Sequence, residues 1–297
     1  MRYTIQRVLV ATSLTEASDP VVRAAHVVAK RTGATLRLFH AARLPAAYYG
    51  SPLGMTAVQP RLLKTQLERS RVEAQEQMRR IGIEEAAWHE VMVDVGAPHR
   101  MLLEAAQTFH PDLLMVGGSE SHGPLAPLLG STAERVLRRS TCPVLVVRGA
   151  LSLPLKHVLA PVDLSPLSQQ ALRTGIDILE QLSAGASPSI EALFVLDPFD
   201  REGMQFTPQQ VDRFAGEEFD RFLAGLGPIG LPAIQPTLRT GLPREEIMHH
   251  LGEHPAELLM LGSHGRGGFQ RMLLGSVASY VSHRVKTSVL IVPPAGG

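Results

Sequence analysis

The chain has 297 residues, enough for two domains of ordinary size. Hydrophobic residues make up 44% and charged residues 19%, the balance of a globular protein, and the formal net charge of +1 gives no field that would attract nucleic acid. Cys142 is the only cysteine, which excludes an intramolecular disulfide and fits a reducing, cytoplasmic setting.

The N-terminal residues 1–8 lack the basic and then apolar segments of a signal peptide. The longest apolar runs, near Val144–Val147 and Leu258–Leu261, fall far short of the roughly 20 residues that span a bilayer. We therefore expect a soluble, cytoplasmic protein that makes no membrane contact.

The chain contains two copies of one pattern. Val8–Ala11 recurs as Val158–Pro161 at an offset of 150 residues, and Leu128–Ser131 recurs as Leu273–Ser276 at an offset of 145. Two long copies indicate a duplication, whereas many short copies would indicate a solenoid.

Each copy alternates short β-branched runs with longer amphipathic stretches, which is typical of βαβ units around a parallel sheet. We expect an α/β protein of two tandem domains, residues 1–150 and 151–297, with five strands in each. In the second domain the expected strands are His157–Val162, Ile190–Leu196, Ile234–Arg239, Glu257–Gly262 and Val289–Pro293.

Helix start signals lie between these strands. Pro166, Pro208 and Pro243 each stand where a first helical turn would begin, and a missing N–H costs nothing there. Ser131 and Glu134 have the spacing of a capping box.

A candidate ligand site lies in the second copy. In an open parallel sheet, ligands bind beyond the carboxyl ends of the strands where strand order reverses. Asp163 ends the first strand there, and Gly262 ends the fourth strand and begins the glycine-rich segment Gly262–Gly268. Glycines allow positive φ and let N–H groups converge on an anion. Gly275 and Ser276 begin the last helix, whose N–H groups and dipole favour phosphate and which Ser276 can cap.

The spacing Gly262-x2-Gly265-x9-Gly275-Ser276 resembles the nucleotide loop of ATP-binding universal stress proteins. Pro161–Ser165 resembles the end of that family's first strand, and Leu193–Asp197 resembles its second strand. The resemblance covers essentially the whole chain. It implies, in each copy, a five-stranded parallel sheet of order 3-2-1-4-5 with helices on both faces, the adenine nucleotide alpha hydrolase-like fold.

The resemblance also implies a nucleotide site, with Asp163 on the ribose, Val195 on the adenine, and the loop glycines and Ser276 on the phosphates. The expected ligand is ATP with Mg²⁺ or Mn²⁺, or another adenine nucleotide. The residues it assigns are Pro161, Val162, Asp163, Val195, Leu261, Gly262, His264, Gly265, Arg266, Gly275, Ser276 and Val277.

Plainer explanations stay open for these positions. A mobile glycine loop with an ordinary serine cap would give the same spacing. Leu261 and Val277 also fit as packing residues. His264 and Arg266 also fit as solvated side chains, and Asp163 also fits as a cap of the following helix.

The first copy has lost the pattern, with Ser13 for the aspartate, Ala41 for the valine, and Gly117–Glu120 for the start of the loop. A carboxylate about 4 Å from a phosphate oxygen costs roughly 4 kcal/mol at an effective dielectric of about 20. That is about a thousandfold in affinity. We therefore expect Glu120 to repel ATP, and the first copy to be a structural partner or to bind an uncharged ligand.

The resemblance implies that the last strands of two copies pair across a two-fold interface. Here Val144–Val147 and Val289–Val292 would make that contact within one chain, as an intramolecular pseudo-dimer, and a further homodimer stays open. The expected function is that of a nucleotide-dependent sensor or adaptor for a protein partner that the sequence does not identify.

Catalytic residues are not expected, because the chain has no Gly-x4-Gly-Lys-Ser/Thr loop and no obvious acid–base pair near the site. Slow ATP hydrolysis or self-phosphorylation, an adenylating or flavin-linked redox enzyme, and a structural protein with empty sites stay open as alternatives. No metal site is expected, since the adjacent His249 and His250 would point about 100° apart on a helix and His254 fits a solvated helix end.

Overall fold

The structure is a computed structural model that describes residues 2–42, 60–84, 90–118, 129–183, 185–197, 207–228, 234–265 and 274–294. Of the residues singled out above, Ser119, Glu120, Leu128, Arg266, Gly267, Gly268 and Leu273 lie outside these ranges.

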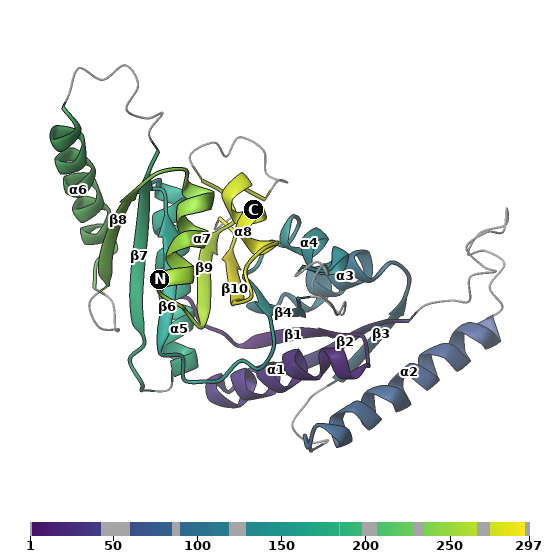
Figure 1. Cartoon of the computed structure of the whole chain (residues 1–297). Helices are drawn as coiled ribbons and strands as arrows, with labels where there is room; N and C mark the ends of the chain where they lie inside the picture. Colours follow the sequence, from purple (N-terminus) through teal and green to yellow (C-terminus); the bar gives the residue numbers. More distant parts are fainter. Residues whose placement is uncertain are drawn as a thin grey trace, which may run out of the picture.

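One ten-stranded sheet runs through the molecule in the order β3-β2-β1-β4-β5-β10-β9-β6-β7-β8, from β8 at one edge to β3 at the other (Figure 1). The strands of the first copy are β1 Arg7–Thr12, β2 Thr35–Ala42, β3 Glu90–Val95, β4 Leu113–Gly117 and β5 Val144–Val147. Those of the second copy are β6 His157–Val162, β7 Ser189–Leu196, β8 Gln235–Thr240, β9 Leu258–Gly262 and β10 Ser288–Val292. Each half has the expected order 3-2-1-4-5, so that prediction is confirmed.

Helices cover both faces of the sheet. One apolar core lies between the sheet and α1 Asp19–Thr32, α2 Pro60–Arg80, α5 Pro166–Ser183 and α6 Pro208–Ala224. The other lies between the sheet and α3 Pro98–Phe109, α4 Ser131–Leu137, α7 Pro243–Glu253 and α8 Ser276–Ser282. Each core contains residues from both copies.

The alternation of side chains along each strand supplies both cores. In β1, Val8 and Val10 pack into the first core and Leu9 into the second. In β6, Val158 and Leu159 divide in the same way. Such strands, buried on both faces, read as continuous apolar runs because side chains on a strand point alternately to its two sides.

The expected strands of the second copy agree with the observed ones to within one residue at each end. The helices start where proline predicted, and Thr207 forms a capping box with Gln210 at the start of α6. The capping box predicted at Ser131 and Glu134 is wrong. Gly130 occupies the N-cap in an extended conformation, which places Ser131 inside the helix with no side-chain capping bond.

The two copies join along their last strands. β5 and β10 pair antiparallel, with Leu145 opposite Leu290, as the resemblance predicted. Arg148 follows β5, and its guanidinium donates to the carbonyl oxygens of Ser282 and Thr287 in the second copy. The sheet and its cores are therefore continuous across the junction.

Candidate functional site

The sheet opens where its strand order reverses in the second copy. β6 and β9 are paired only at Val158–Leu258 and Leu159–Leu259. Beyond these pairs β6 continues beside β7 as far as Val162, whereas β9 continues beside β10 as far as Gly262. The carboxyl ends of β6 and β9 thus separate, which is where ligands bind in open α/β sheets.

Asp163 follows β6 in a tight turn. Its Oδ1 accepts hydrogen bonds from the backbone N–H of Ser165 at 3.0 Å and from the Ser165 hydroxyl at 2.6 Å. Between them Leu164 has a φ of 60°, a conformation that non-glycine residues adopt at a cost. Ser168 closes the turn: its backbone N–H donates to Ser165 Oγ at 3.1 Å, and its hydroxyl oxygen accepts from the Asp163 N–H at 3.3 Å. The turn fixes the carboxylate at the end of the strand.

The carboxylate of Asp163 lies against the glycine loop that follows β9. A Cβ atom added to Gly265 would stand 2.4 Å from Asp163 Oδ2. The two segments, about 100 residues apart in the chain, therefore meet as the topology of an open parallel sheet requires. No side chain larger than that of glycine fits at position 265 unless the carboxylate or the loop moves.

Close approach, and not positive φ, distinguishes Gly262 and Gly265 in the described part of the loop. Gly262, Gly265 and Gly275 are absent from the positive-φ residues, so the conformational reason given from sequence is wrong for these three. A Cβ at Gly262 would lie 3.2 Å from the His264 carbonyl oxygen, and one at Gly275 would lie 3.4 Å from that of Ser263. The approach is therefore prohibitive at Gly265, tight at Gly262 and close to an ordinary contact at Gly275.

Backbone hydrogen bonds hold the two ends of the loop together. Gly275 N–H donates to the Ser263 carbonyl oxygen at 2.8 Å, and Ser263 N–H donates to the carbonyl oxygen of Val292 in β10 at 2.9 Å. Gly275 is the N-cap of α8, so the prediction that Ser276 caps this helix is wrong. Ser276 is exposed at the first helical position.

The other predicted site residues lie around this opening. Pro161 and Val162 form the end of β6, Val195 lies near the end of β7 with 7% of its surface exposed, and Leu261 is buried in β9. Val277 is partly buried against the second core.

His264 is half-buried, and its Nδ1 lies 2.8 Å from the Ser263 hydroxyl. Sequence reasoning did not single out Ser168, which completes the Asp163 turn; the Ser-x-x-Ser spacing after Asp163 was the available signal.

The first copy keeps the backbone arrangement without the carboxylate. Gly130 N–H donates to the Gly118 carbonyl oxygen, and Gly118 N–H donates to the Val147 carbonyl oxygen at 3.0 Å. Leu14 has a φ of 66°, matching Leu164, but the preceding residue is Ser13, whose hydroxyl contacts Thr15 at 2.8 Å. This turn therefore places a neutral hydroxyl where the second copy has a carboxylate.

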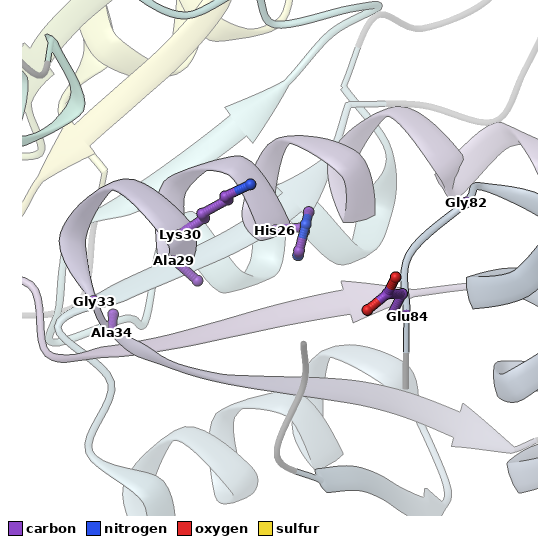
Figure 2. A pocket seen from close by; sticks show the side chains of 7 residues that line it. All are labelled: His26, Ala29, Lys30, Gly33, Ala34, Gly82 and Glu84. Atoms are coloured by element: carbon purple, nitrogen blue, oxygen red, sulfur yellow. The ribbon is translucent and has the colours of Figure 1, made fainter. Parts of the chain in front are cut away.

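A cavity of about 580 Å³ lies elsewhere, beside α1 and the turn after α2 in the first copy (Figure 2). Its lining includes His26, Lys30 and Glu84, and none of the predicted site residues. Its position outside the sheet opening separates it from the Asp163 site.

None of the helices in the described ranges is long and apolar enough to cross a membrane.

Comparison with known proteins identifies relatives over nearly the whole chain. The model of the Universal stress protein family matches it twice, at residues 4–148 and 154–293. A universal stress protein of Mycolicibacterium smegmatis is 30% identical over 214 residues, 66% of this chain and 65% of that protein. One of Mycobacterium tuberculosis is 29% identical over 193 residues, 60% of this chain and 61% of that protein. The chain thus aligns with less than two thirds of the length of these relatives.

The solved structure of a universal stress protein from Archaeoglobus fulgidus superposes with a TM-score of 0.64 at 19% identity. The superposition covers 99% of this chain and 98% of that one. This likeness shows that the two chains share a fold.

Proposed function

Because the chain belongs to the universal stress protein family, we propose that its second copy binds an adenine nucleotide, with ATP as the expected ligand. The observation that carries the proposal is the contact between the Asp163 carboxylate and the Gly265 backbone at the opening of the sheet. It joins the two motifs, remote in sequence, that resemble the family's nucleoside and phosphate segments.

The proposal divides the chain into domains 1–150 and 151–297, with one nucleotide site in the second. The protein would act in the cytoplasm as a sensor or adaptor, with nucleotide occupancy changing the surface that a protein partner meets. Mg²⁺ or Mn²⁺ would accompany the phosphates.

Charge determines which way round the nucleotide lies. A phosphate about 4 Å from Asp163 would be repelled by about 4 kcal/mol at an effective dielectric of about 20. The ribose hydroxyls, which donate hydrogen bonds, therefore belong at the carboxylate. The phosphates belong further along the loop, toward Ser276. Gly275 N–H is engaged with Ser263, so the unpaired N–H groups of the first turn of α8 are the donors left for them.

An ATP titration with Mg²⁺ present tests the proposal, preceded by release and identification of any nucleotide that co-purifies. We expect about one nucleotide per chain. Gly265→Ala should lower the affinity at least about tenfold, because the new Cβ displaces the Asp163 carboxylate or the loop. Gly216→Ala in α6 is the matched control, since no atom lies within 4 Å of its added Cβ. Absence of binding to the wild-type chain would overturn the proposal.

Asp163→Asn tests the orientation in the same titration. Asparagine keeps the oxygen that accepts from Ser165, so the turn should persist. If Asp163 contacts ribose, the loss of charged hydrogen bonds worth about 1.5–3 kcal/mol should weaken binding about 10–100-fold. Tighter binding would place the phosphates beside residue 163 and contradict the orientation. Two nucleotides per chain would contradict the assignment of a single site to the second copy.

A further inference from the structure

A cluster of metal-ligating side chains lies at the end of α7, away from the carboxyl edge of the sheet where Asp163 lies. One ring nitrogen of His250, one of His254 and one carboxylate oxygen of Glu253 lie within 4.8 Å of one another. His250 is 2% exposed, whereas Glu253 and His254 are exposed. The cluster is therefore anchored in the protein on one side and open to solvent on the other.

The spacing of the two histidines explains why they meet. Residues four apart lie on the same face of a helix, which is how His-x3-His pairs hold zinc in metalloenzymes. The rings of His250 and His254 have centroids 4.8 Å apart, and His254 N–H donates to the His250 carbonyl oxygen at 2.7 Å. Unlike the adjacent pair His249 and His250, this pair shares a face of the helix.

His250 carries the second, independent sign of a ligand. Its Nδ1 is buried and has no hydrogen-bond partner among the residues that the structure describes. Its Nε2 lies 3.0 Å from Glu191 Oε2, although the alignment does not satisfy a hydrogen bond. Since buried polar atoms normally have partners, the bare Nδ1 needs an explanation.

Glu191 fits the place of a supporting carboxylate. Metal-bound histidines usually give their second ring nitrogen to a carboxylate or carbonyl, which fixes the ring and leaves the other nitrogen for the metal. Glu191 is itself held by the hydroxyl of Thr237 on the neighbouring strand β8. The arrangement would leave His250 Nδ1 as the coordinating atom.

The first copy shows that the fold does not require this cluster. Arg37, Ala105 and Phe109 occupy the places of Glu191, His250 and His254. The Arg37 guanidinium lies over the Phe109 ring, 4.4 Å from its centroid. A cation and a ring thus replace the ligating groups there, with Glu90 paired to Arg37 at 3.1 Å, so the two histidines belong to the second copy alone.

We propose that His250, Glu253 and His254 bind a divalent transition-metal ion of the zinc class, with Glu191 as the positioning residue for His250. Two imidazoles and a carboxylate match the preferences of zinc, and water would complete four-coordination. Glu253 also forms an ion pair with Arg239. Arg239 has a second carboxylate partner, Glu246, at 3.5 Å, so it would stay paired when Glu253 binds the metal. The site is independent of the proposed nucleotide site.

The test uses the full, tag-free chain, stripped with a chelator and titrated with Co²⁺ without nucleotide, followed by displacement with Zn²⁺. We expect about one equivalent of Co²⁺ with the visible spectrum of a tetrahedral site. His254→Ala should weaken binding by more than about tenfold, and Glu191→Gln by about 10–100-fold. His254 is exposed, so its removal should leave the fold intact, which circular dichroism of the stripped variant checks.

His249→Ala is the matched comparison, because this neighbouring histidine is also exposed and is not a member of the cluster, although its Nε2 stands 3.5 Å from Glu253 Oε1. It should change the affinity by less than about threefold, because it removes no ligand and only one exposed contact to Glu253. Failure of the wild-type chain to bind about one equivalent would overturn the proposal. Equal losses of affinity in His249→Ala and His254→Ala would also overturn it, because they would mean that exposed histidines bind the ion without a defined site. Neither result would affect the ATP titration.

Discussion

Asp19 links two helices of the first copy through charge. Its carboxylate accepts from Arg80 Nε at 3.0 Å and Nη2 at 2.7 Å, and from Gln77 Nε2 at 2.8 Å. Burial acts to raise the pKa of Asp19, but the hydrogen bonds from Arg80 and Gln77 outweigh it and hold that pKa below its ordinary value. The first turn of α1 is thereby fastened to the end of α2.

Asp19→Asn should lower the free energy of unfolding by about 1 kcal/mol at about pH 7, because a paired charge is lost. The folded pKa lies below the unfolded one, so the contribution is complete above the unfolded pKa and is lost as pH falls through the folded pKa. Urea unfolding at about pH 7 and about pH 3 should show the difference shrinking in acid. Asp220→Asn, at an exposed position of α6, is the control; an unchanged difference in acid would contradict the argument.

Single residues of the candidate site were predictable where chemistry alone selects them. Asp163 stands out because a carboxylate ends a buried strand, and Gly265 because the loop after β9 is rich in glycine. Their contact was not predictable from spacing, and the reason for glycine was misjudged. Steric closeness to a residue about 100 positions away, and not local φ, forbids a side chain at position 265.

At the level of elements, α5 packs closely on β9. A Cβ added to Gly175 in α5 would stand 1.9 Å from Met260 Sδ, in a β9 side chain that is 2% exposed. Gly216 in α6 has nothing within 4 Å of the same added atom. The two helical glycines therefore differ in surroundings and not in secondary structure.

Gly175→Ala should lower the free energy of unfolding by about 1–2 kcal/mol, because overpacking outweighs the roughly 1 kcal/mol that alanine gains in a helix. Gly216→Ala should raise it by up to about 1 kcal/mol. Denaturant unfolding of the two variants measures both effects. Equal stabilisation by both would mean that Met260 moves aside freely and that α5 is not held as tightly as the contact indicates.

Strands were the most predictable elements of the second copy, because four of them are apolar runs bounded by turns; the fifth, the edge strand β8, is largely polar and exposed. Helix starts marked by proline were also predictable. The starts at Ser131 and Ser276 were misplaced by one residue, since the glycine before each serine occupies the N-cap position itself. Whether the serine or the glycine before it occupies the N-cap depends on backbone dihedral angles, which the sequence does not specify.

For the molecule as a whole, duplication predicted the two half-sheets, and the family resemblance predicted the antiparallel junction of β5 with β10. The sequence did not predict Arg148 as a link, because no spacing relates it to the carbonyl groups of Ser282 and Thr287. It also did not predict cores shared by both copies. Shared cores make the copies parts of one folding unit, so we expect a single cooperative unfolding transition.

Arg148→Ala tests how strongly the junction holds that unit together. Burial lowers the pKa of Arg148 to about 10, so the guanidinium is still charged at neutral pH. Its removal strips donors from two carbonyl groups of the second copy and should cost about 2–3 kcal/mol, while the transition stays single because the cores remain. Calorimetry with denaturant unfolding measures both, and Arg139→Ala, at an exposed position, is the control. Two resolved transitions in the wild-type chain would mean that the copies unfold independently, and the junction would then contribute little to stability.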